Sequence, residues 1–296
     1  MKVLVLGGSG MLGHQLCRIL SKKQEVLATF HNQPDGFAQD PILPAGRMIG
    51  GLDAVDWPHF LATLKEARPD VVVNAIGIVK QRDEAKQAVL SIEVNALFPH
   101  RLADACQEIG ARLMQISTDC VFSGFKGEYS EIDLPDPVDL YGRTKLLGEV
   151  NREGCLTLRT SIIGWELHRR SGLLEWFASQ RGKTIQGYDR AIYSGVSTGA
   201  LSRLIREIIE TRPELSGLYH VAGLPISKYD LLSRLRDRLG WTDIRIEKDE
   251  TFRCDRSLTA QRFERMTGWK APSWDEMIDE LAQEWPIYEE WRRSEK

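Results

Sequence analysis

The sequence predicts an α/β fold built on an open, doubly wound parallel sheet, with a smaller α/β lobe after it. Strand-like and helix-like segments alternate over residues 1–165, and a glycine-rich turn joins the first strand to the first helix. Residues 71–75 are apolar until their end, as expected of a strand covered on both faces. Alternation of this kind predicts parallel strands joined by right-handed crossovers.

The first predicted strand, residues 2–6, runs into a glycine turn and then into a helix over residues 14–22. The turn reads Gly7-Gly8-Ser9-Gly10-Met11-Leu12-Gly13. This order makes a dinucleotide-binding fingerprint credible, because glycines let the backbone approach a pyrophosphate at the positive end of a helix. Both G-x-G-x-x-G, starting at Gly8, and G-x-x-G-x-x-G, starting at Gly7, fit. A tight turn without a ligand is the alternative.

The second predicted strand, residues 25–30, ends at Phe30-His31-Asn32 without an acidic residue. A site specific for NAD usually places Asp or Glu there to bind the adenosine ribose. The missing acid favours NADPH, with NADH as the other possibility, because a carboxylate would repel the 2′-phosphate. No arginine stands at the same place to bind that phosphate, so the sequence shows the missing acid and no added cation.

The remaining elements of this region place polar residues at strand ends. We expect strands at residues 47–52, 71–75, 113–116 and 155–158, and helices at 56–67, 81–109 (interrupted near Phe98-Pro99) and 140–152. Gly7, Asp53, Asn74, Thr118 and Thr160 each follow a strand. Ligands of such sheets bind at the carboxyl ends of the strands, so these residues are predicted to share one crevice.

After residue 165 the pattern changes to glycine-rich connections between helices. Helices are expected at residues 173–180, 198–211, 228–239 and 274–284, with short strands at 184–185, 218–221 and 243–246. We interpret residues 166–296 as a smaller lobe, some of whose elements are interleaved into the first domain, residues 1–165. Residues 289–296 are expected to be a fraying charged tail.

The composition excludes several classes of protein. The formal net charge of −3 over 296 residues gives no electrostatic case for nucleic acid. No apolar run reaches membrane-spanning length, and the chain starts with a core strand rather than a signal peptide. The five cysteines and six histidines are scattered, so neither a disulfide framework nor a metal site is expected. We expect a soluble, cytoplasmic protein.

Tyr141 and Lys145 stand four residues apart on a predicted helix and therefore share one face. The ammonium of Lys145 would favour the phenolate of Tyr141 and lower its pKa, normally about 10. A general acid/base acting on a C=O/CH–OH pair needs this shift. The pair is weak evidence alone, because both residues are common on helix surfaces.

The segments around this pair resemble a known family. Residues 117–124 read STDCVFSG, and Tyr141-Gly142-Arg143-Thr144-Lys145 is followed by Gly148-Glu149. The chain resembles the extended short-chain dehydrogenase/reductase superfamily and, within it, the dTDP-4-dehydrorhamnose reductase family, whose pattern is STDYVFDG followed by YGxTKxxGE. The resemblance covers nearly the whole chain, including the glycine turn, Asn74-Ala75, Val94-Asn95-Ala96, Leu158-Arg159-Thr160-Ser161 and the segments at 194–198 and 253–258.

The resemblance implies a Rossmann-type fold and NAD(P)H-dependent reduction of the 4-keto group of a nucleotide-linked 6-deoxysugar. By position, Thr118 would hydrogen-bond the C4 oxygen, Tyr141 would donate the proton, and Lys145 would bind the nicotinamide ribose. The implied cofactor-binding residues are Gly7, Ser9, Gly10, Met11, Leu12, Gly13, His31, Asn32, Asp53, Asn74, Ala75, Ile76, Asn95, Ser117, Tyr141, Lys145 and Thr160.

The substrate set is expected to lie mainly in the C-terminal lobe. It comprises Val79, Asp119, Cys120, Val121, Trp165, Arg190, Val196, Arg253 and Arg256. Arg190, and either Arg253 or Arg256, are candidates for the substrate diphosphate. Trp165 is expected either to stack on the hexose or to cover the core. Cys120 stands where the related sugar dehydratases have glutamate, which argues against a dehydratase.

Two other functions stay open at this point. One is a nucleotide-sugar epimerase with tightly held NAD, against which the missing acid after the second strand and the STD string argue. The other is a non-catalytic subunit resembling the methionine adenosyltransferase beta subunit. The expected partner is a nucleotide-diphosphate-linked ketosugar, with a homodimer as a further possibility. The nucleotide, the sugar and the stereochemistry at C4 are not determined by the sequence.

Overall fold

The computed structural model describes residues 1–32, 47–79, 86–168 and 170–294. The chain divides into two compact units. The first comprises Met1–Thr118, Asp139–Arg159 and Leu201–Tyr219; the second comprises Asp119–Val138, Thr160–Ala200 and His220–Lys296. The sequence predicts a boundary at residue 165 with some later elements interleaved into the first domain; in the structure residues 201–219 return to the first unit, and residues 119–138 already belong to the second.

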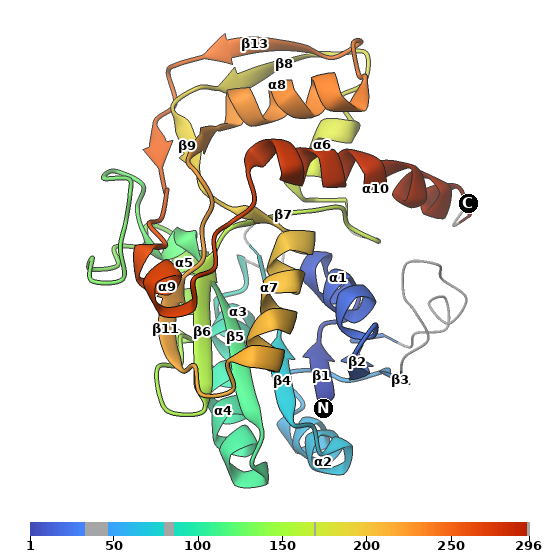
Figure 1. Cartoon of the computed structure of the whole chain (residues 1–296), viewed down its shortest axis with the longest axis vertical. Helices are drawn as coiled ribbons and strands as arrows, with labels where there is room; N and C mark the ends of the chain where they lie inside the picture. Colours follow the sequence, from blue (N-terminus) through green and yellow to red (C-terminus); the bar gives the residue numbers. More distant parts are fainter. Residues whose placement is uncertain (33–46, 80–85, 169, 295–296) are drawn as a thin grey trace. The chain divides into compact units, whose positions relative to one another are not determined.

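A seven-stranded sheet forms the centre of the first unit, counted over the described residues. Its strands are β1 Lys2–Leu6, β2 Glu25–Thr29, β3 Arg47–Ile49, β4 Val71–Asn74, β5 Arg112–Thr118, β6 Cys155–Thr160 and β11 Gly217–His220. From left to right in Figure 1 they lie in the order β11-β6-β5-β4-β1-β2-β3. The pairs β1–β2, β2–β3, β1–β4 and β4–β5 are parallel. The winding direction reverses between β1 and β4, which confirms the doubly wound sheet predicted from the sequence.

Helices cover this sheet on both faces. They are α1 Met11–Leu20, α2 Trp57–Ala67, α3 Ala88–Ile92, the π-helix η2 Glu93–Leu97, α4 Phe98–Ile109, α5 Leu140–Leu147 and α7 Thr198–Thr211, whose first residues belong to the second unit. Leu4 and Leu6 of β1 pack with Phe60 of α2 and Leu102 of α4. Val3 and Val5 of β1 are equally buried and face the opposite side of the sheet. Figure 1 shows α1 beside α7, and Lys23 forms an ion pair with Glu210 of α7.

The helical stretch predicted over residues 81–109 contains the α-helices α3 and α4 in its described part, whereas residues 81–85 lie outside the described residues. The interruption expected near Phe98-Pro99 takes the form of the π-helical turn η2, which ends directly before Phe98. Pro99 has no N–H to donate into that preceding turn, where Asn95 lies.

Two predicted boundaries near the segment of Tyr141 and Lys145 also change. Helix α5 ends at Leu147 rather than at residue 152, because the chain leaves the helix at Gly148. Strand β5 continues to Thr118, two residues beyond the predicted end. Thr118 is therefore the last residue of a strand rather than part of a loop.

The second unit consists of short strands and four described helices. The helices are α6 Leu173–Ala178, α8 Lys228–Leu239, α9 Gln261–Thr267 and α10 Trp274–Ser294, with the 3-10 turn η3 Asp119–Val121. The strands are β7 Ile162–Ile163, β8 Thr184–Tyr188, β9 Ala191–Tyr193, β10 Val196–Ser197, β12 Ile226–Ser227, β13 Arg245–Asp249 and β14 Cys254–Asp255. They form the small sheets β10–β7, β12–β9–β14 and β13–β8.

The prediction of a fraying tail after residue 289 is wrong. Helix α10 continues through Pro286 to Ser294. Tyr288 is fully buried, and Arg292 forms an ion pair with the buried carboxylate of Glu175 on α6. These contacts hold the last helical turns to the second unit. Among the helices of the described residues, none is both long and apolar enough to cross a bilayer.

Candidate active site

The glycine turn after β1 has the geometry of a phosphate-binding turn. Gly7 adopts a φ of 81°, a left-handed conformation that favours glycine. The Gly10 N–H donates to the Gly7 carbonyl at 2.9 Å, which closes the turn. A Cβ at Gly13 would lie 2.0 Å from the Gly7 oxygen, so the first turn of α1 packs directly on the loop. Of the two registers, Gly7-Gly10-Gly13 is the one whose members form this contact.

The N-terminus of α1 offers unsatisfied N–H groups next to this turn. Its N-cap is Gly10, which provides no capping side chain, and the first turn has no acidic residue. The first N–H groups of a helix lack internal partners, and the helix dipole favours an anion there. Ser9 and Met11 are partly exposed, whereas Leu12 is buried. These residues fit the pyrophosphate of a dinucleotide.

An acidic residue from another segment lies near the end of β2, although residues 29–32 at that end include none. Asp53, which follows β3, has its carboxylate 3.8 Å from Nδ1 of His31, and both side chains are exposed. The Val55 N–H donates to the other oxygen of Asp53. The acid expected to be missing at the end of β2 is thus missing from that segment only. Asp53, which follows the neighbouring strand β3, brings a carboxylate to the same place.

Two amide side chains shape the loop after β4 instead of projecting freely. Asn74 donates to Gln115 at 2.8 Å and accepts from the Ile76 N–H at 3.1 Å. Asn95 exchanges two hydrogen bonds of 2.9 Å with the backbone of Ile78. The partly exposed members of this loop are Ala75, Ile76, Gly77 and Val79. The hydrogen bonds of Asn74 and Asn95 thus hold the loop in shape.

The three predicted catalytic residues come from β5 and α5 in the first unit. The Asp139 carboxylate caps α5 by accepting from the Gly142 N–H at 2.8 Å, and this fixes the start of the helix just before Tyr141. Tyr141 is partly exposed, while Thr118 and Lys145 are buried. The Lys145 ammonium donates to the carbonyl of Ile116 at 2.7 Å. Lys145 is therefore anchored to the strand that ends at Thr118.

Burial changes the acid–base behaviour of Lys145. Removal from water disfavours the ammonium and lowers the pKa of Lys145 to about 8, while the negative charge of Glu149 acts in the opposite direction. A buried lysine that titrates close to neutral pH is characteristic of functional sites rather than of ordinary helix surfaces. From the sequence alone, Tyr141 and Lys145 could lie on an ordinary exposed helix surface; the burial of Lys145 argues against that alternative.

The arginines predicted to bind a diphosphate have different surroundings. Nε of Arg256 donates to the Phe122 carbonyl at 2.9 Å, and Nη1 lies 3.8 Å from Sγ of Cys120. Arg190 forms an exposed ion pair with Glu250 at 3.2 Å, and Arg253 is exposed. Arg256 thus holds the segment that carries Cys120, whereas Arg190 and Arg253 lie exposed at the surface, Arg190 in its pair with Glu250.

The other predicted residues of the second unit are mostly enclosed. Asp119 and Val121 lie buried in η3, Val196 is buried on β10, and Cys120 is partly exposed. The buried Thr160 hydroxyl donates to the Ser161 carbonyl at 3.2 Å. Of these, Cys120 presents the most accessible side chain.

The assignment of Trp165 to the substrate set needs correction. Trp165 is 0% exposed, and its indole N–H donates to the Leu281 carbonyl at 2.8 Å. Its ring centroid lies 4.7 Å from that of Trp285 and 6.2 Å from that of Tyr288, both on α10. Trp165 is therefore a core residue of the second unit, which is the other of the two roles expected for it. The length of α10, underestimated from the sequence, supplies this cover.

Replacing Trp165 by phenylalanine is accordingly expected to affect stability and not substrate binding. The change removes the hydrogen bond from the indole to the Leu281 carbonyl and leaves a void beside it, which should lower the free energy of unfolding by about 2 kcal/mol. Urea unfolding measures this, with Trp176→Phe on the exposed side of α6 as the matched control. A raised KM for a sugar substrate with unchanged stability would contradict the correction.

Comparison with known proteins decides the family. Residues 1–286 match the RmlD substrate binding domain family. The chain belongs to this family. It is 31% identical over 240 residues to the dTDP-4-dehydrorhamnose reductase of Shigella flexneri, a match that covers 75% of this chain and 73% of that protein. The family resemblance predicted from the sequence is confirmed.

Further relatives carry two different names. The dTDP-4-dehydrorhamnose reductase of Streptomyces griseus is 35% identical over 147 residues, covering 49% of this chain and only 43% of that protein. The methionine adenosyltransferase 2 subunit beta of Mus musculus is 25% identical over 250 residues, covering 80% of this chain and 71% of that subunit. A solved structure of a hypothetical dTDP-4-dehydrorhamnose reductase from Sulfolobus tokodaii superposes with a TM-score of 0.77 at 28% identity, covering 93% of this chain and 98% of that one.

Proposed function

We propose that this member of the family is an NADPH-dependent reductase of the 4-keto group of a nucleotide-linked 6-deoxysugar. The observation that carries the proposal is the position of Lys145. It is buried, lies four residues after Tyr141 on α5, and is hydrogen-bonded to Ile116, two residues before Thr118. A proton donor, a cation that activates it and a hydroxyl that can hold a carbonyl oxygen thus come from two adjoining elements of one unit.

Each of the three side chains has one task in the proposed reaction. Bound NADPH would supply a hydride to C4 of the sugar. The Thr118 hydroxyl donates a hydrogen bond to the C4 oxygen and so fixes the carbonyl. As that oxygen gains negative charge, Tyr141 transfers its phenolic proton to it, which completes the alcohol and leaves a phenolate. The Lys145 ammonium stabilises that phenolate until it is reprotonated from solvent.

The proposed substrate class rests on the relatives and on Cys120. Both reductases named above are enzymes of a dTDP-linked sugar, so dTDP is the first carrier to test. Cys120 stands where an elimination of water would need an acid/base such as glutamate. NADPH is proposed ahead of NADH because β2 ends without an acid; Asp53, which follows β3 and lies beside His31, is the carboxylate that would favour NADH instead. The homodimer stays a prediction.

A second candidate function is a non-catalytic subunit. The observation in its favour is the match to the mouse methionine adenosyltransferase subunit over 80% of this chain. Such a subunit could keep the dinucleotide turn without any need for a proton donor. The buried Lys145 beside an intact Tyr141 and Thr118 favours the reductase, because burying a lysine is costly unless it serves a purpose.

Oxidation of NADPH across a panel of nucleotide-linked 4-ketosugars tests the proposal. We expect steady oxidation with at least one dTDP-linked 4-keto-6-deoxysugar and a lower KM for NADPH than for NADH. Copurified NAD with no net consumption of NADPH would point to the epimerase instead. Absence of turnover with every carrier, under conditions in which the dinucleotide binds, would favour the non-catalytic subunit.

A further inference from the structure

A buried carboxylate lies directly behind the proposed catalytic pair. Glu149, just after α5, accepts from the Ser117 hydroxyl at 2.6 Å. It also accepts from Nε and Nη2 of Arg159 on β6, both at 2.7 Å. The side chains of Glu149 and Arg159 are each only 6% exposed. A bidentate pair removed from water in this way is held in one geometry.

Consecutive residues at the end of β5 form hydrogen bonds to α5 and to the segment directly after it. The carbonyl of Ile116 accepts from Lys145, and the hydroxyl of Ser117 donates to Glu149. Thr118, the proposed partner of the sugar oxygen, comes next. The family resemblance implies that Ser117 binds the cofactor, but its hydroxyl proton is used by Glu149.

The turn between Lys145 and Glu149 is fixed by the π-helix. Gly148 has an ordinary φ of −91°, yet a Cβ there would lie 1.9 Å from the Asn95 carbonyl. The chain after α5 therefore passes in contact with η2, and Glu149 has little freedom to move away from β5. This rigidity distinguishes Glu149 from a surface acid that happens to lie nearby.

Few groups of the described residues are found around the Lys145 ammonium. Glu149, just after α5, is the carboxylate whose charge acts on it, and Arg159 on β6 is the partner of Glu149. The Ile116 carbonyl of β5 accepts from Lys145. After β4, Gly77 lies nearby without a side chain, since a Cβ there would be 3.9 Å from Nζ of Lys145.

We propose that Glu149 is a positioning residue for the reduction: together with Ser117 and Arg159 it fixes the end of β5 against α5 and supplies the negative charge that keeps Lys145 an ammonium. This inference rests on the proposed function, because it assigns Lys145 its role there. The pKa of Lys145 agrees in direction, since burial lowers it and Glu149 opposes that shift. Without Glu149, Lys145 would lose its proton at a lower pH and would no longer stabilise the phenolate of Tyr141.

The variant Glu149→Gln tests this by removing the charge while keeping the shape and an acceptor oxygen. We expect the pKa of Lys145 to fall by about one unit. Titration of the Lys145 signal by NMR after isotopic labelling, assigned with Lys145→Arg, measures this without any turnover. The alkaline limb of the kcat–pH profile should move to lower pH by the same amount, with KM little changed.

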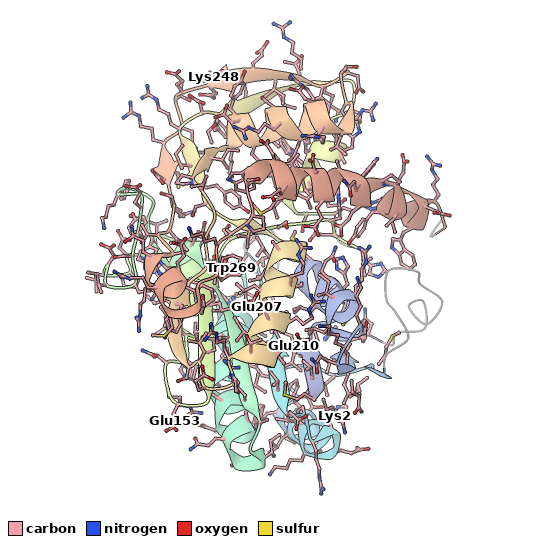
Figure 2. The ribbon with its side chains drawn as sticks, in the orientation of Figure 1. Lys2, Glu153, Glu207, Glu210, Lys248 and Trp269 are labelled. Atoms are coloured by element: carbon pink, nitrogen blue, oxygen red, sulfur yellow. The ribbon has the colours of Figure 1, made fainter. Side chains whose placement is uncertain are left out.

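A matched control removes an exposed carboxylate close by. Glu153 lies four residues further along and points away from the ribbon, as Figure 2 shows. Glu153→Gln changes the net charge equally and should leave both the Lys145 titration and the pH profile where they are. Glu149→Asp, which restores the charge, should return the titration most of the way to that of the unmodified protein.

The outcomes separate the inference from the proposed function. A Lys145 titration that does not move in Glu149→Gln would overturn the inference and leave Glu149 a purely structural residue. If Glu149→Gln does not fold, the double variant Glu149→Gln, Arg159→Met replaces the buried pair by neutral groups and carries the same test. If no sugar is reduced by the unmodified protein, the proposed function fails, whereas the titration still decides the role of Glu149.

Discussion

Replacing Tyr141 by phenylalanine is expected to lower kcat for ketone reduction about 10²- to 10⁴-fold, the usual range for loss of a general acid. The ring and its packing remain, but no proton reaches the C4 oxygen as negative charge develops. The glycine turn lies on a different element, so the affinity for NADPH should change little. Steady-state kinetics and a fluorescence titration with NADPH measure the two quantities separately.

Tyr188→Phe is the matched control for this experiment. Tyr188 lies on β8 and is exposed, and the same hydroxyl is removed. Its kcat should equal that of the unmodified protein. If Tyr141→Phe kept full biological activity, the catalytic assignment would be wrong and the non-catalytic subunit would become the better interpretation.

Replacing Gly148 by alanine is expected to give the second large effect. The added Cβ would meet the Asn95 carbonyl at 1.9 Å, and the neighbouring backbone, unlike a flexible side chain, cannot turn aside. Overpacking of this kind should lower the free energy of unfolding by about 3 kcal/mol. Because α5 carries Tyr141 and Lys145, the shift should also reduce kcat. Chemical denaturation and steady-state kinetics measure the two effects.

Gly154→Ala separates this steric cost from the general cost of replacing a glycine. Gly154 has a φ of 73°, and no other group lies within 4 Å of the position that an alanine Cβ would take, so only backbone strain opposes alanine there. We expect a loss of about 1 kcal/mol for that variant. Equal losses for the two variants would show that the contact between Gly148 and Asn95 is not a tight one.

The sheet was predictable because its signals are local. Apolar runs of strand length, separated by helical periodicity, predict the elements, and capping residues set their ends. Helix α8, for example, has the predicted bounds because Ser227 caps its start and Gly240 ends it. The glycine turn and the Tyr141–Lys145 spacing are local signals as well. The spacing alone does not predict that Lys145 is buried and donates to the Ile116 carbonyl.

The features that the sequence did not reveal all depend on contacts between distant segments. Glu149 stands in the motif around Lys145, but its partner Arg159 lies on another strand and no spacing rule joins them. Trp165 is a core residue because α10 covers it, and the length of α10 is underestimated from the sequence. Asp53 reaches His31 only because β2 and β3 are neighbours. Tertiary packing decides each of these placements.

Following the hydride tests the central claim most directly. NADPH carrying deuterium at both positions of nicotinamide C4 is incubated with the protein and a dTDP-linked 4-keto-6-deoxysugar, and the product is analysed by mass spectrometry and NMR. We predict one deuterium on C4 of the sugar, formed by the unmodified protein and formed about 10²- to 10⁴-fold more slowly by Tyr141→Phe. A product without deuterium, or a sugar recovered unchanged while the labelled NADPH remains intact, would contradict the account.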